Sequence, residues 1–575
     1  MDKRWVLKPD GEAETVGFLS TQLKINPILI NLLVQRGITT YDEARNFFRP
    51  SLDHLHDPFL MKDMDVAVER IEEAIRQREK IIVYGDYDVD GTTAVSIVYT
   101  FLKTLHGEVG YYIPDRYKEG YGISKQGIDF AKENNYSLII ALDCGIKSVE
   151  KIAYAKELGI DFIICDHHRP GDELPHAAAV LDPKRNDCPY PFKELSGCGV
   201  GFKLIQAIAQ QNNIPFNQIE QYLDLVAVSI AADIVPITGE NRILAFFGLQ
   251  RLNREPRPGI KAILELSGFK KELTISDVVF SIAPRINAAG RIEHGTKAVE
   301  LLISKNEDLA SFLGDDINEN NITRKGLDSQ ITEHALQIVE LDPDFLTRKS
   351  TVVYHPEWHK GVIGIVASRL TDKYYRPTIV LTKSNGYVSG SARSIKDFDV
   401  YNAIEGCSDL LEQFGGHMYA AGLTMKEENV QAFRERFEEI VSSTIKDYML
   451  TREIEVDAML NLKDITPRFY KILMQFSPFG PGNMAPVFRT DGVIDNGKGR
   501  VVGNNHLKLT ISQEGMKQNV FDGIAFQLGH HQPMIELSEP FDIVYHIEEN
   551  NFNGRTSLQL NIKDLKFSQD KVMAS

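Results

Sequence analysis

Short apolar segments between residues 80 and 168 alternate with predicted helices, and three of these segments end in acidic or histidine side chains. Short, β-branched runs separated by helices are typical of a parallel sheet with crossover helices. The carboxyl ends of parallel strands meet at one edge of the sheet, where the sites of such folds lie. The sequence therefore predicts that one edge gathers the residues following runs 81–84, 138–142 and 162–165, which are Asp86, Asp143 and Asp166-His167-His168.

The densest negative charge follows the first run, in the segment Gly85-Asp86-Tyr87-Asp88-Val89-Asp90-Gly91. Like charges placed this closely repel each other, and they persist only where cations neutralise them or water solvates them. A calcium loop also spaces aspartates by two, but it needs flanking helices and a glutamate where this chain has Val98. A solvated turn capped by one aspartate is the other alternative, and it leaves two aspartates unexplained. We therefore favour a cation site.

Asp233 is a further candidate, because it follows the apolar helical segment 225–232. Taken singly, Asp143 could cap a helix and His167 could be a buried, hydrogen-bonded histidine. Taken together, carboxylates and one or two imidazoles at one sheet edge indicate a site for two divalent ions. Oxygen-rich ligand sets with one nitrogen suit Mn²⁺ or Mg²⁺ better than a structural zinc ion.

The rest of the chain indicates several domains of different composition. At 575 residues it is long enough for about three or four of them. Short helices are expected over 1–75, a long polar helical stretch over about 297–340, and a second α/β unit from about residue 349. From about 453 to 567, short alternating segments separated by turns with Asn and Gly indicate an all-β module, such as a small barrel. Residues 568–575 are expected to form a tail.

Composition limits the location and the partners of the protein. No apolar run approaches the ~20 residues of a membrane span, and no signal peptide is visible, so we expect a cytoplasmic protein without membrane contact. The five cysteines form no CxxC pair, which indicates reduced, buried thiols. The net charge of -16 argues against coating nucleic acid by bulk electrostatics. It still permits a narrow basic channel that leads to an acidic, metal-filled site.

The ordered motifs Asp88-Val89-Asp90, Asp143-Cys144-Gly145 and Asp166-His167-His168 resemble those of the DHH phosphoesterase superfamily. Further runs resemble its branch of exonucleases with a DHHA1 domain: 119–122, 232–236, 283–288, 359–369, 390–394 and 414–417. The resemblance covers about residues 70–565 and implies an α/β multidomain fold. The implied parts are a helical lead-in over 1–75, a parallel-sheet DHH domain over 76–296, a long connecting helix over 297–345, a smaller α/β DHHA1 domain over 346–450 and a C-terminal all-β OB-like barrel over 451–567.

The resemblance also implies roles for individual residues. Asp143 would bridge two ions, and Asp86 would support the site from behind the ligands. His168 would contact the scissile phosphate or assist proton transfer, and His417 would add a further phosphate contact. Some members of the family carry histidine where this chain has Tyr84. The implied metal ligands are Asp88, Asp90, Asp143, His167 and Asp233, and the implied substrate-binding residues are Arg285, Asn287, Ser391, Arg393 and His359.

The activity that the resemblance implies is hydrolysis of single-stranded DNA from its 5′ end with two Mn²⁺ or Mg²⁺ ions. The implied setting is DNA repair and recombination, alongside a helicase and a single-strand-binding protein. A nanoRNase, a cyclic-dinucleotide phosphodiesterase or a pyrophosphatase of the same superfamily is the alternative enzyme, and it would lack the helical insertion and the barrel. A non-catalytic single-strand-binding protein is the alternative from another class, and the intact acidic ligands argue against it.

Overall fold

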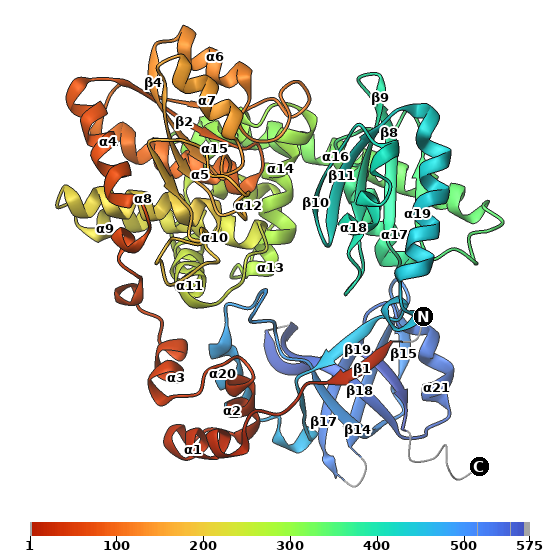
Figure 1. The fold of residues 1–575 in the computed structure, drawn as a ribbon. Coiled ribbons are helices and arrows are strands. Elements are labelled where there is room, and N and C mark those ends of the chain that lie inside the picture. The colour runs from red at the N-terminus through yellow and green to blue at the C-terminus, as the bar shows by residue number, and fades with distance from the viewer. Residues whose placement is uncertain (1–2, 514–515, 553, 569–575) are drawn as a thin grey trace. The chain divides into compact units, whose positions relative to one another are not determined.

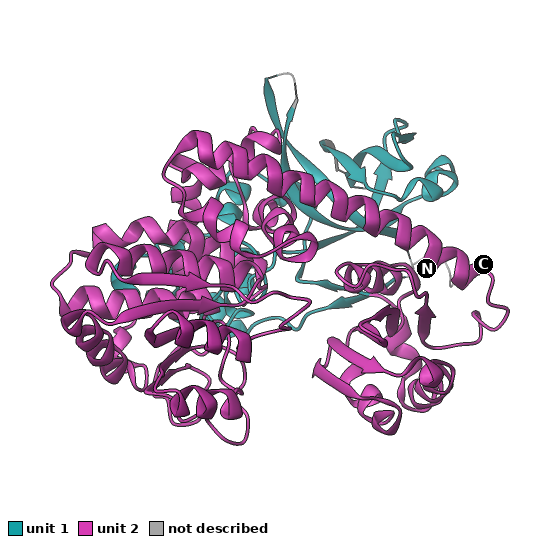
Figure 2. Ribbon diagram, turned by 90° about the horizontal axis from the view of Figure 1, so that it is seen from above, with its two compact units in different colours: residues 1–54, 236–238, 453–575 teal, residues 55–235, 239–452 magenta. Residues whose placement is uncertain are grey.

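The computed structural model describes residues 3–513, 516–552 and 554–568 and divides into two compact units (Figures 1 and 2). Unit 1 comprises residues 1–54, 236–238 and 453–575, and unit 2 comprises residues 55–235 and 239–452. The predicted tail lies outside the described residues from position 569 onward. None of the helices in the described ranges is long and apolar enough to cross a membrane.

Unit 2 contains a five-stranded parallel sheet in the order β3-β2-β4-β5-β6. The three strands with acidic ends are neighbours in this order, and their last residues stand in register, since Gly85 pairs with Leu142 and Leu142 with Cys165. The residues that follow them therefore begin at the same level of one sheet edge, as predicted. The strands are β2 (Lys80–Gly85), β3 (Val109–Tyr112), β4 (Tyr136–Leu142), β5 (Asp161–Cys165) and β6 (Ala179–Leu181).

Helix α5 begins at Val89, inside the acidic segment 85–91. Asp88 is its N-cap, because the Asp88 carboxylate accepts a hydrogen bond of 3.0 Å from the N–H of Gly91. Asp90 consequently lies in the first turn of the helix and is buried. The helices of this part of unit 2 are α4 (Met64–Gln77), α5 (Val89–Leu105), α6 (Lys125–Glu133), α7 (Val149–Glu157), α8 (Gly197–Gln211), α9 (Phe216–Ile219), α10 (Leu223–Ala232), α11 (Gly239–Arg254), α12 (Pro258–Leu266), α13 (Ile275–Asp277) and α14 (Ala283–Ile292).

The predicted continuous helix from about 297 was wrong at residues 304–306, where the chain leaves the helical conformation. Two helices occupy the region, α15 (Thr296–Ile303) and α16 (Glu307–Glu340). The side chain of Asn306 accepts a hydrogen bond of 2.8 Å from the N–H of Leu309 and so starts α16 as its N-cap. Asn306 carries this signal, but residues 304–306 contain neither Pro nor Gly to mark the break.

A second sheet of unit 2 has the order β10-β11-β9-β8-β7, in which only the pair β7–β8 is parallel. Its apolar core includes Ile379, Leu381, Phe433 and Phe437. The predicted second α/β unit is confirmed by this sheet and its helices. They are β7 (Thr351–Tyr354), α17 (Ile363–Tyr374), β8 (Thr378–Ser384), β9 (Tyr387–Arg393), α18 (Val400–Glu405), β10 (Gln413–His417), β11 (Ala420–Met425) and α19 (Val430–Thr444).

Unit 1 contains the predicted barrel, because β14 pairs with both β18 and β16 and so closes the ring β14-β18-β19-β17-β16. The helices α1 (Ala13–Leu23), α2 (Pro27–Val34) and α3 (Tyr41–Phe48) share one hydrophobic core with it. The remaining elements are β12 (Glu453–Val456), β13 (Ala458–Met459), α20 (Pro467–Leu473), β14 (Phe488–Asp495), β15 (Arg500–Val502), β16 (His506–Gln513), β17 (Met516–Ala525), α21 (Gln532–Glu536), β18 (Phe541–Phe552) and β19 (Arg555–Phe567).

The N-terminal segment is less independent than the purely helical lead-in that we expected. It begins with a strand, β1 (Arg4–Leu7), which pairs in parallel with β12 at the start of the barrel region. Helix α4 (Met64–Gln77) falls at the end of the expected lead-in over 1–75, but it lies in unit 2. The predicted residue boundaries of the domains stay predictions. All five cysteines are buried and free, as the composition indicated.

Candidate metal centre

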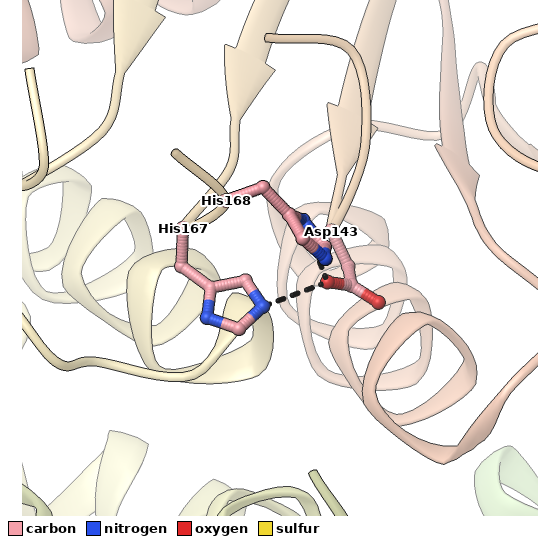
Figure 3. Close-up of side chains that lie close together, drawn as sticks. All are labelled: Asp143, His167 and His168. Carbon is pink, nitrogen blue, oxygen red and sulfur yellow. Dashed lines mark ion pairs between the residues drawn. The ribbon is translucent and has the colours of Figure 1, made fainter. Parts of the chain in front are cut away.

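The predicted acidic and histidine side chains converge at the carboxyl edge of the parallel sheet. Nε2 of His167 lies 3.2 Å from Asp143 Oδ1, 3.5 Å from Asp233 Oδ2 and 3.7 Å from Asp90 Oδ2. Figure 3 shows His167 and His168 beside the Asp143 carboxylate, with both ion pairs directed at the same oxygen, Oδ1. These residues form two groups of three whose ligand atoms lie within 4.8 Å of one another: Asp143, His167 and His168, and Asp90, His167 and Asp233.

Local backbone geometry turns Asp143 into this cluster. Its φ angle is 57°, in the left-handed region, and its N–H donates to the carbonyl of Cys165 at 2.9 Å. A non-glycine residue held in that region costs free energy and is common at functional sites. Gly197, at the start of α8, makes room for it, since a Cβ there would lie 2.6 Å from Asp143 Cβ. The close approach of α8 therefore requires glycine at position 197.

Asp166 has a positioning role that we did not predict, although it is the first residue of the Asp-His-His motif. Its Oδ1 accepts from the N–H groups of His167 and His168 and lies 2.8 Å from Nδ1 of His168, while Oδ2 accepts from the N–H of Ile146. Burial would raise the pKa of Asp166, but its bonds to His168 and the backbone lower it to about 2. Burial would conversely lower the pKa of His168, and the bond and charge of Asp166 raise it to about 9.

Several buried polar atoms of the cluster have no hydrogen-bond partner among the described residues: Asp86 Oδ2, Asp143 Oδ1, and both ring nitrogens of His167. Burial, followed by the charges of neighbouring aspartates, raises the pKa values of Asp86 and Asp143 well above their usual range. The same causes raise the pKa of Asp233 to about 8. Buried polar groups are normally satisfied, so these atoms fit cations that the chain itself does not supply.

The cluster does not use all the predicted residues in the same way. Asp90 accepts 2.7 Å hydrogen bonds from the N–H groups of Gly197 and Cys198 and from the Ser229 hydroxyl, so the protein fixes its carboxylate firmly. Asp88 is occupied as the cap of α5 and belongs to neither group of three. Its role as a ligand stays a prediction, because one lone pair of a capping carboxylate remains available.

The Tyr84 hydroxyl is engaged elsewhere. It donates to the carbonyl of Gly122 at 2.9 Å and accepts from the N–H of Ser124 at 3.1 Å. The ring is buried, and these two partners tie β2 to the turn that precedes α6. Tyr84 therefore holds this turn, and its hydroxyl is not among the ligand atoms of the cluster.

Comparison with known proteins places this geometry in a family. Models of three domains match the chain: the DHH family N-terminal domain over 80–230, the DHHA1 domain over 348–443 and the RecJ OB domain over 456–564. The single-stranded-DNA-specific exonuclease RecJ of Bacillus subtilis is 41% identical over 98% of this chain and 71% of its own. That of Escherichia coli is 33% identical over 94% and 96%. This chain belongs to the RecJ family.

Solved RecJ structures agree with the fold. RecJ from Thermus thermophilus in complex with Mn²⁺ has a TM-score of 0.84 and 28% identity over 98% of this chain and 79% of its own. The same protein in complex with Mg²⁺ has a TM-score of 0.78. The predicted fold class is therefore confirmed: a DHH domain, a connecting helix, a DHHA1 domain and an OB-like barrel.

Two of the substrate-binding residues predicted for this RecJ-family chain lie together on β9. Arg393 Nη1 donates to Ser391 Oγ at 3.1 Å, and burial lowers the pKa of the guanidinium. The first turn of α17 approaches both, because a Cβ on Gly364 would lie 2.9 Å from Ser391 Oγ and 3.0 Å from Arg393 Nη2. A hydroxyl, a guanidinium and a helix N-terminus are three groups that suit a phosphate.

The other predicted substrate-binding residues lie on several elements. Arg285 on α14 donates to Asn318 Oδ1 at 3.1 Å and to the carbonyl of Ser281 at 2.6 Å, and Asn287 is partly buried on the same helix. His359 accepts from the N–H of Gly361 at 3.1 Å, in the turn before α17. His417 is exposed on β10, and its role stays a prediction.

Two further features lie beside these residues, and sequence reasoning missed the contributions of Arg324 and Tyr121 to them. Burial and then the charges of Arg116, Arg324 and Arg393 lower the pKa of Arg291 to about 10, which shows how closely these arginines gather. Arg324 lies in the polar α16, where nothing in the sequence distinguished it. The Tyr121 hydroxyl lies 3.4 Å from both the Asp143 carbonyl and His168 Nε2. It belongs to the run 119–122 that resembled the family, so a signal for it was present.

Proposed function

We propose that this protein is a metal-dependent exonuclease that hydrolyses single-stranded DNA from its 5′ end, in the 5′→3′ direction. The observation that carries the proposal is the cluster of buried carboxylate and imidazole atoms without hydrogen-bond partners. Its setting is a RecJ-family chain whose relatives are named single-stranded-DNA-specific exonucleases. The barrel, matched by the RecJ OB domain model, argues against the smaller hydrolases of the superfamily.

The residues proposed to hold two Mn²⁺ or Mg²⁺ ions are those of the cluster. The chemistry of the donors supports this, since carboxylate oxygens with one imidazole suit such ions. When bound, two divalent cations would neutralise the charge of a phosphodiester, stabilise the attacking and leaving oxygens and lower the pKa of water at the site. The proposed ligands are Asp88, Asp90, Asp143, His167 and Asp233. His167 is the residue that the two groups of three have in common, and Asp143 is proposed to bridge the two ions.

Two further residues act on the reacting phosphate or support the site. The raised pKa of His168, about 9, keeps its imidazole protonated near neutral pH, and Asp166 fixes the ring through Nδ1. His168 can therefore donate a hydrogen bond to the scissile phosphate from Nε2 and give its proton to the leaving oxygen. Asp86 accepts from the N–H of Gly122 at 3.4 Å and supports the ligands from behind.

The 5′→3′ direction of hydrolysis is proposed to come from the phosphate-binding groups of β9 and α17. Ser391, Arg393 and the first turn of α17 would hold the 5′ phosphate, so that the bond after it reaches the metal centre. Arg285 and Asn287 would contact the backbone of the same strand, and His359 and His417 would add contacts from the DHHA1 domain.

The barrel is proposed to bind the single strand that follows. OB folds bind single strands by stacking bases on aromatics beside basic residues. Phe526 is exposed on the barrel, as are Lys498 and Arg500, whereas Phe476 and Phe488 belong to its core. By its family, the protein would act in DNA repair and recombination in the cytoplasm, with a helicase and a single-strand-binding protein as partners.

The test is time-resolved product analysis on single strands labelled at either the 5′ or the 3′ end, with Mn²⁺. A 5′ label should appear at once as mononucleotide, and a 3′ label should appear in progressively shorter strands. Arg393→Gln should slow digestion of 5′-phosphorylated strands by about ten- to a hundredfold, because a charged hydrogen bond to phosphate is lost. The reverse pattern of labels would overturn the polarity, and binding without release of nucleotides would indicate the non-catalytic alternative.

A further inference from the structure

A cavity of about 680 Å³ lies in unit 2, outside the cluster of acidic residues. Its walls come from α16, the loop between β7 and α17, the end of β8, and Tyr117. The two parallel strands of the second sheet, β7 and β8, end beside it, which is where α/β folds place ligands. We call it the His–Trp pocket, after its residues His334, His355, Trp358 and His359, which lie beside Lys360 and Lys383.

One wall of the His–Trp pocket is a preformed aromatic surface. The rings of His355 and Trp358 are stacked, with centroids 5.6 Å apart and planes 30° apart. Trp358 Nε1 donates to His334 Nδ1 at 3.3 Å, and the rings of His334 and His355 lie 4.7 Å apart. The Thr382 hydroxyl holds the backbone at Trp358 by donating to the Trp358 carbonyl at 2.6 Å. Planar surfaces of this kind bind nucleobases by stacking.

The three imidazoles share a hydrogen-bond pattern, because each accepts at Nδ1. A neutral imidazole that accepts at Nδ1 carries its proton on Nε2, so each ring has an N–H to offer a ligand. Burial also lowers the pKa of His359 and favours its neutral form. The groups that donate to Nδ1 are Trp358 Nε1 for His334, the Glu357 N–H for His355 and the Gly361 N–H for His359.

The charge of the pocket complements a phosphate. Lys360 and Lys383 both line it, against one carboxylate, Glu357. Burial and the charge of Arg116 lower the pKa of Lys360, so this ammonium gains from a negative ligand. Lys383 is exposed and pairs with Glu427 at 2.7 Å, which leaves its other N–H groups available. Donors thus outnumber acceptors, and the volume lies within the usual range of ~300–1,000 Å³ for small-molecule sites.

We propose that the His–Trp pocket binds a nucleotide, with its base on the ring wall and its phosphate at Lys360 and Lys383. This inference rests on the proposed function, which supplies nucleotides from two sources: the released mononucleotide, or a unit of the uncut strand. The pocket adjoins the arginines near β9, because Arg291 Nη1 donates to the Gly361 carbonyl at 2.8 Å and Tyr117 donates to the Arg291 carbonyl. A bound nucleotide would therefore contact both the DHH and the DHHA1 parts of unit 2.

The sequence offers a direct reporter, because its two tryptophans are Trp5 and Trp358. In the full chain with Trp5→Phe, fluorescence reports the pocket alone. Deoxyadenosine monophosphate, added with EDTA to prevent hydrolysis, should quench this emission saturably. Deoxyadenosine should bind at least about tenfold more weakly, since it lacks the charged hydrogen bonds to the lysines. A short oligodeoxyadenylate serves as the second arm: quenching by the free nucleotide identifies the product as ligand, and quenching by the strand alone identifies the substrate.

Variants separate the pocket from its surroundings. Lys360→Gln combined with Lys383→Gln should weaken quenching about tenfold or more. The matched control Lys373→Gln removes a lysine of the same domain that pairs with Glu340 outside the pocket, and should leave quenching unchanged. Arg393→Gln should also leave quenching in place. Loss of quenching in Arg393→Gln would assign the signal to the proposed 5′-phosphate site and overturn the inference. Absence of saturable quenching by both the free nucleotide and the oligodeoxyadenylate would also overturn it.

The same samples distinguish failure of this inference from failure of the proposed function. With Mn²⁺ and labelled single strands, the Trp5→Phe protein should release nucleotides. If it does so without any response of Trp358 to either arm, the pocket is not a nucleotide site and the exonuclease proposal stands. If it releases none, the exonuclease proposal fails on its own measurement.

Discussion

Two buried polar clusters in unit 2 handle charge in opposite ways. Around Lys203 and Glu240 the chain satisfies every charge itself: the ion pair is 2.6 Å long, and Glu240 also accepts from the His56 N–H and the Tyr190 hydroxyl. The Lys203 ammonium uses its remaining donors on the His56 carbonyl and Gln206. At the carboxyl edge of the parallel sheet, atoms of Asp86, Asp143 and His167 find no hydrogen-bond partner within the part of the chain that the structure describes.

The difference between the two clusters indicates which buried charges serve the fold and which serve the chemistry of the site. A buried ion pair costs solvation free energy, and complete hydrogen bonding offsets most of that cost. The Lys203–Glu240 cluster is complete, so its charges are compensated within the chain and it needs no ligand. The metal centre is incomplete within the chain. Without metal, its carboxylates hold protons more tightly than usual, as their raised pKa values show, and divalent cations would take the place of those protons. Residues of the first cluster should therefore affect stability, and residues of the second should affect chemistry.

The largest effect is expected from Asp143→Asn. Hydrolysis of single-stranded DNA should fall at least about a thousandfold, or ~4 kcal/mol in activation free energy, because the side chain shared by both proposed ions loses its charge. The free energy of unfolding should change by less than ~1 kcal/mol, since Asp143 Oδ1 accepts no hydrogen bond from the described residues that the substitution would remove. Rates and urea unfolding measure the two quantities. Asp161→Asn, at the amino end of β5, is the matched control and should keep its activity. Activity within a tenth of the parent would contradict the central place of Asp143.

Glu240→Ala should act in the opposite sense. It leaves the Lys203 ammonium buried without its counter-ion, and the free energy of unfolding should fall by about 3–5 kcal/mol. Activity per folded molecule should remain close to that of the parent protein. Glu255→Ala removes an exposed glutamate just after α11 and should change the free energy of unfolding by less than ~0.5 kcal/mol. Equal stabilities of Glu240→Ala and Glu255→Ala in urea titrations would contradict the structural role of the Lys203–Glu240 cluster.

Stabilisation by Mn²⁺ should increase with pH. In the metal-free protein the pKa of Asp233, about 8, exceeds its unfolded value of ~3.9, so stability is lost as the pH rises through 8. Mn²⁺ must displace that proton. The affinity of the site for Mn²⁺ should therefore rise with pH, by up to about tenfold per pH unit for each proton displaced. The Mn²⁺-induced rise in Tm should therefore be larger at about pH 8 than at about pH 6. An equal rise at both values, or an equal rise in Asp143→Asn, would show that the ion binds elsewhere.

The smallest effect is expected from Tyr84→Phe. The hydroxyl holds the turn at Gly122 and Ser124, so its loss should cost about 1–2 kcal/mol of unfolding free energy. The rate of hydrolysis and its dependence on Mn²⁺ concentration should stay within about twofold, since the hydroxyl is not among the cluster's ligand atoms. A large increase in the Mn²⁺ concentration needed for half-maximal rate would instead make Tyr84 a ligand.

Much of the fold was predictable because its signals are local. The apolar runs of β2, β4 and β5, with acidic residues directly after them, predicted both the sheet and the edge at which Asp143 and His167 meet. The second α/β unit and the barrel were visible in the same way. Helix boundaries were harder to predict where the signal was a single capping side chain. Asp88 caps the start of α5, and Asn306 divides the expected helix.

The sequence by itself determined which residues carry charge and which strand ends they follow, because hydrophobic periodicity and local order are written along the chain. Only the tertiary structure decided how each charge is used. Asp90 is fixed by α8 and Ser229, Tyr84 is occupied by a turn, and Asp143 Oδ1 is left without a partner, through contacts between residues far apart in sequence. Satisfaction of a buried polar atom depends on every neighbour in space, and no short segment contains that information.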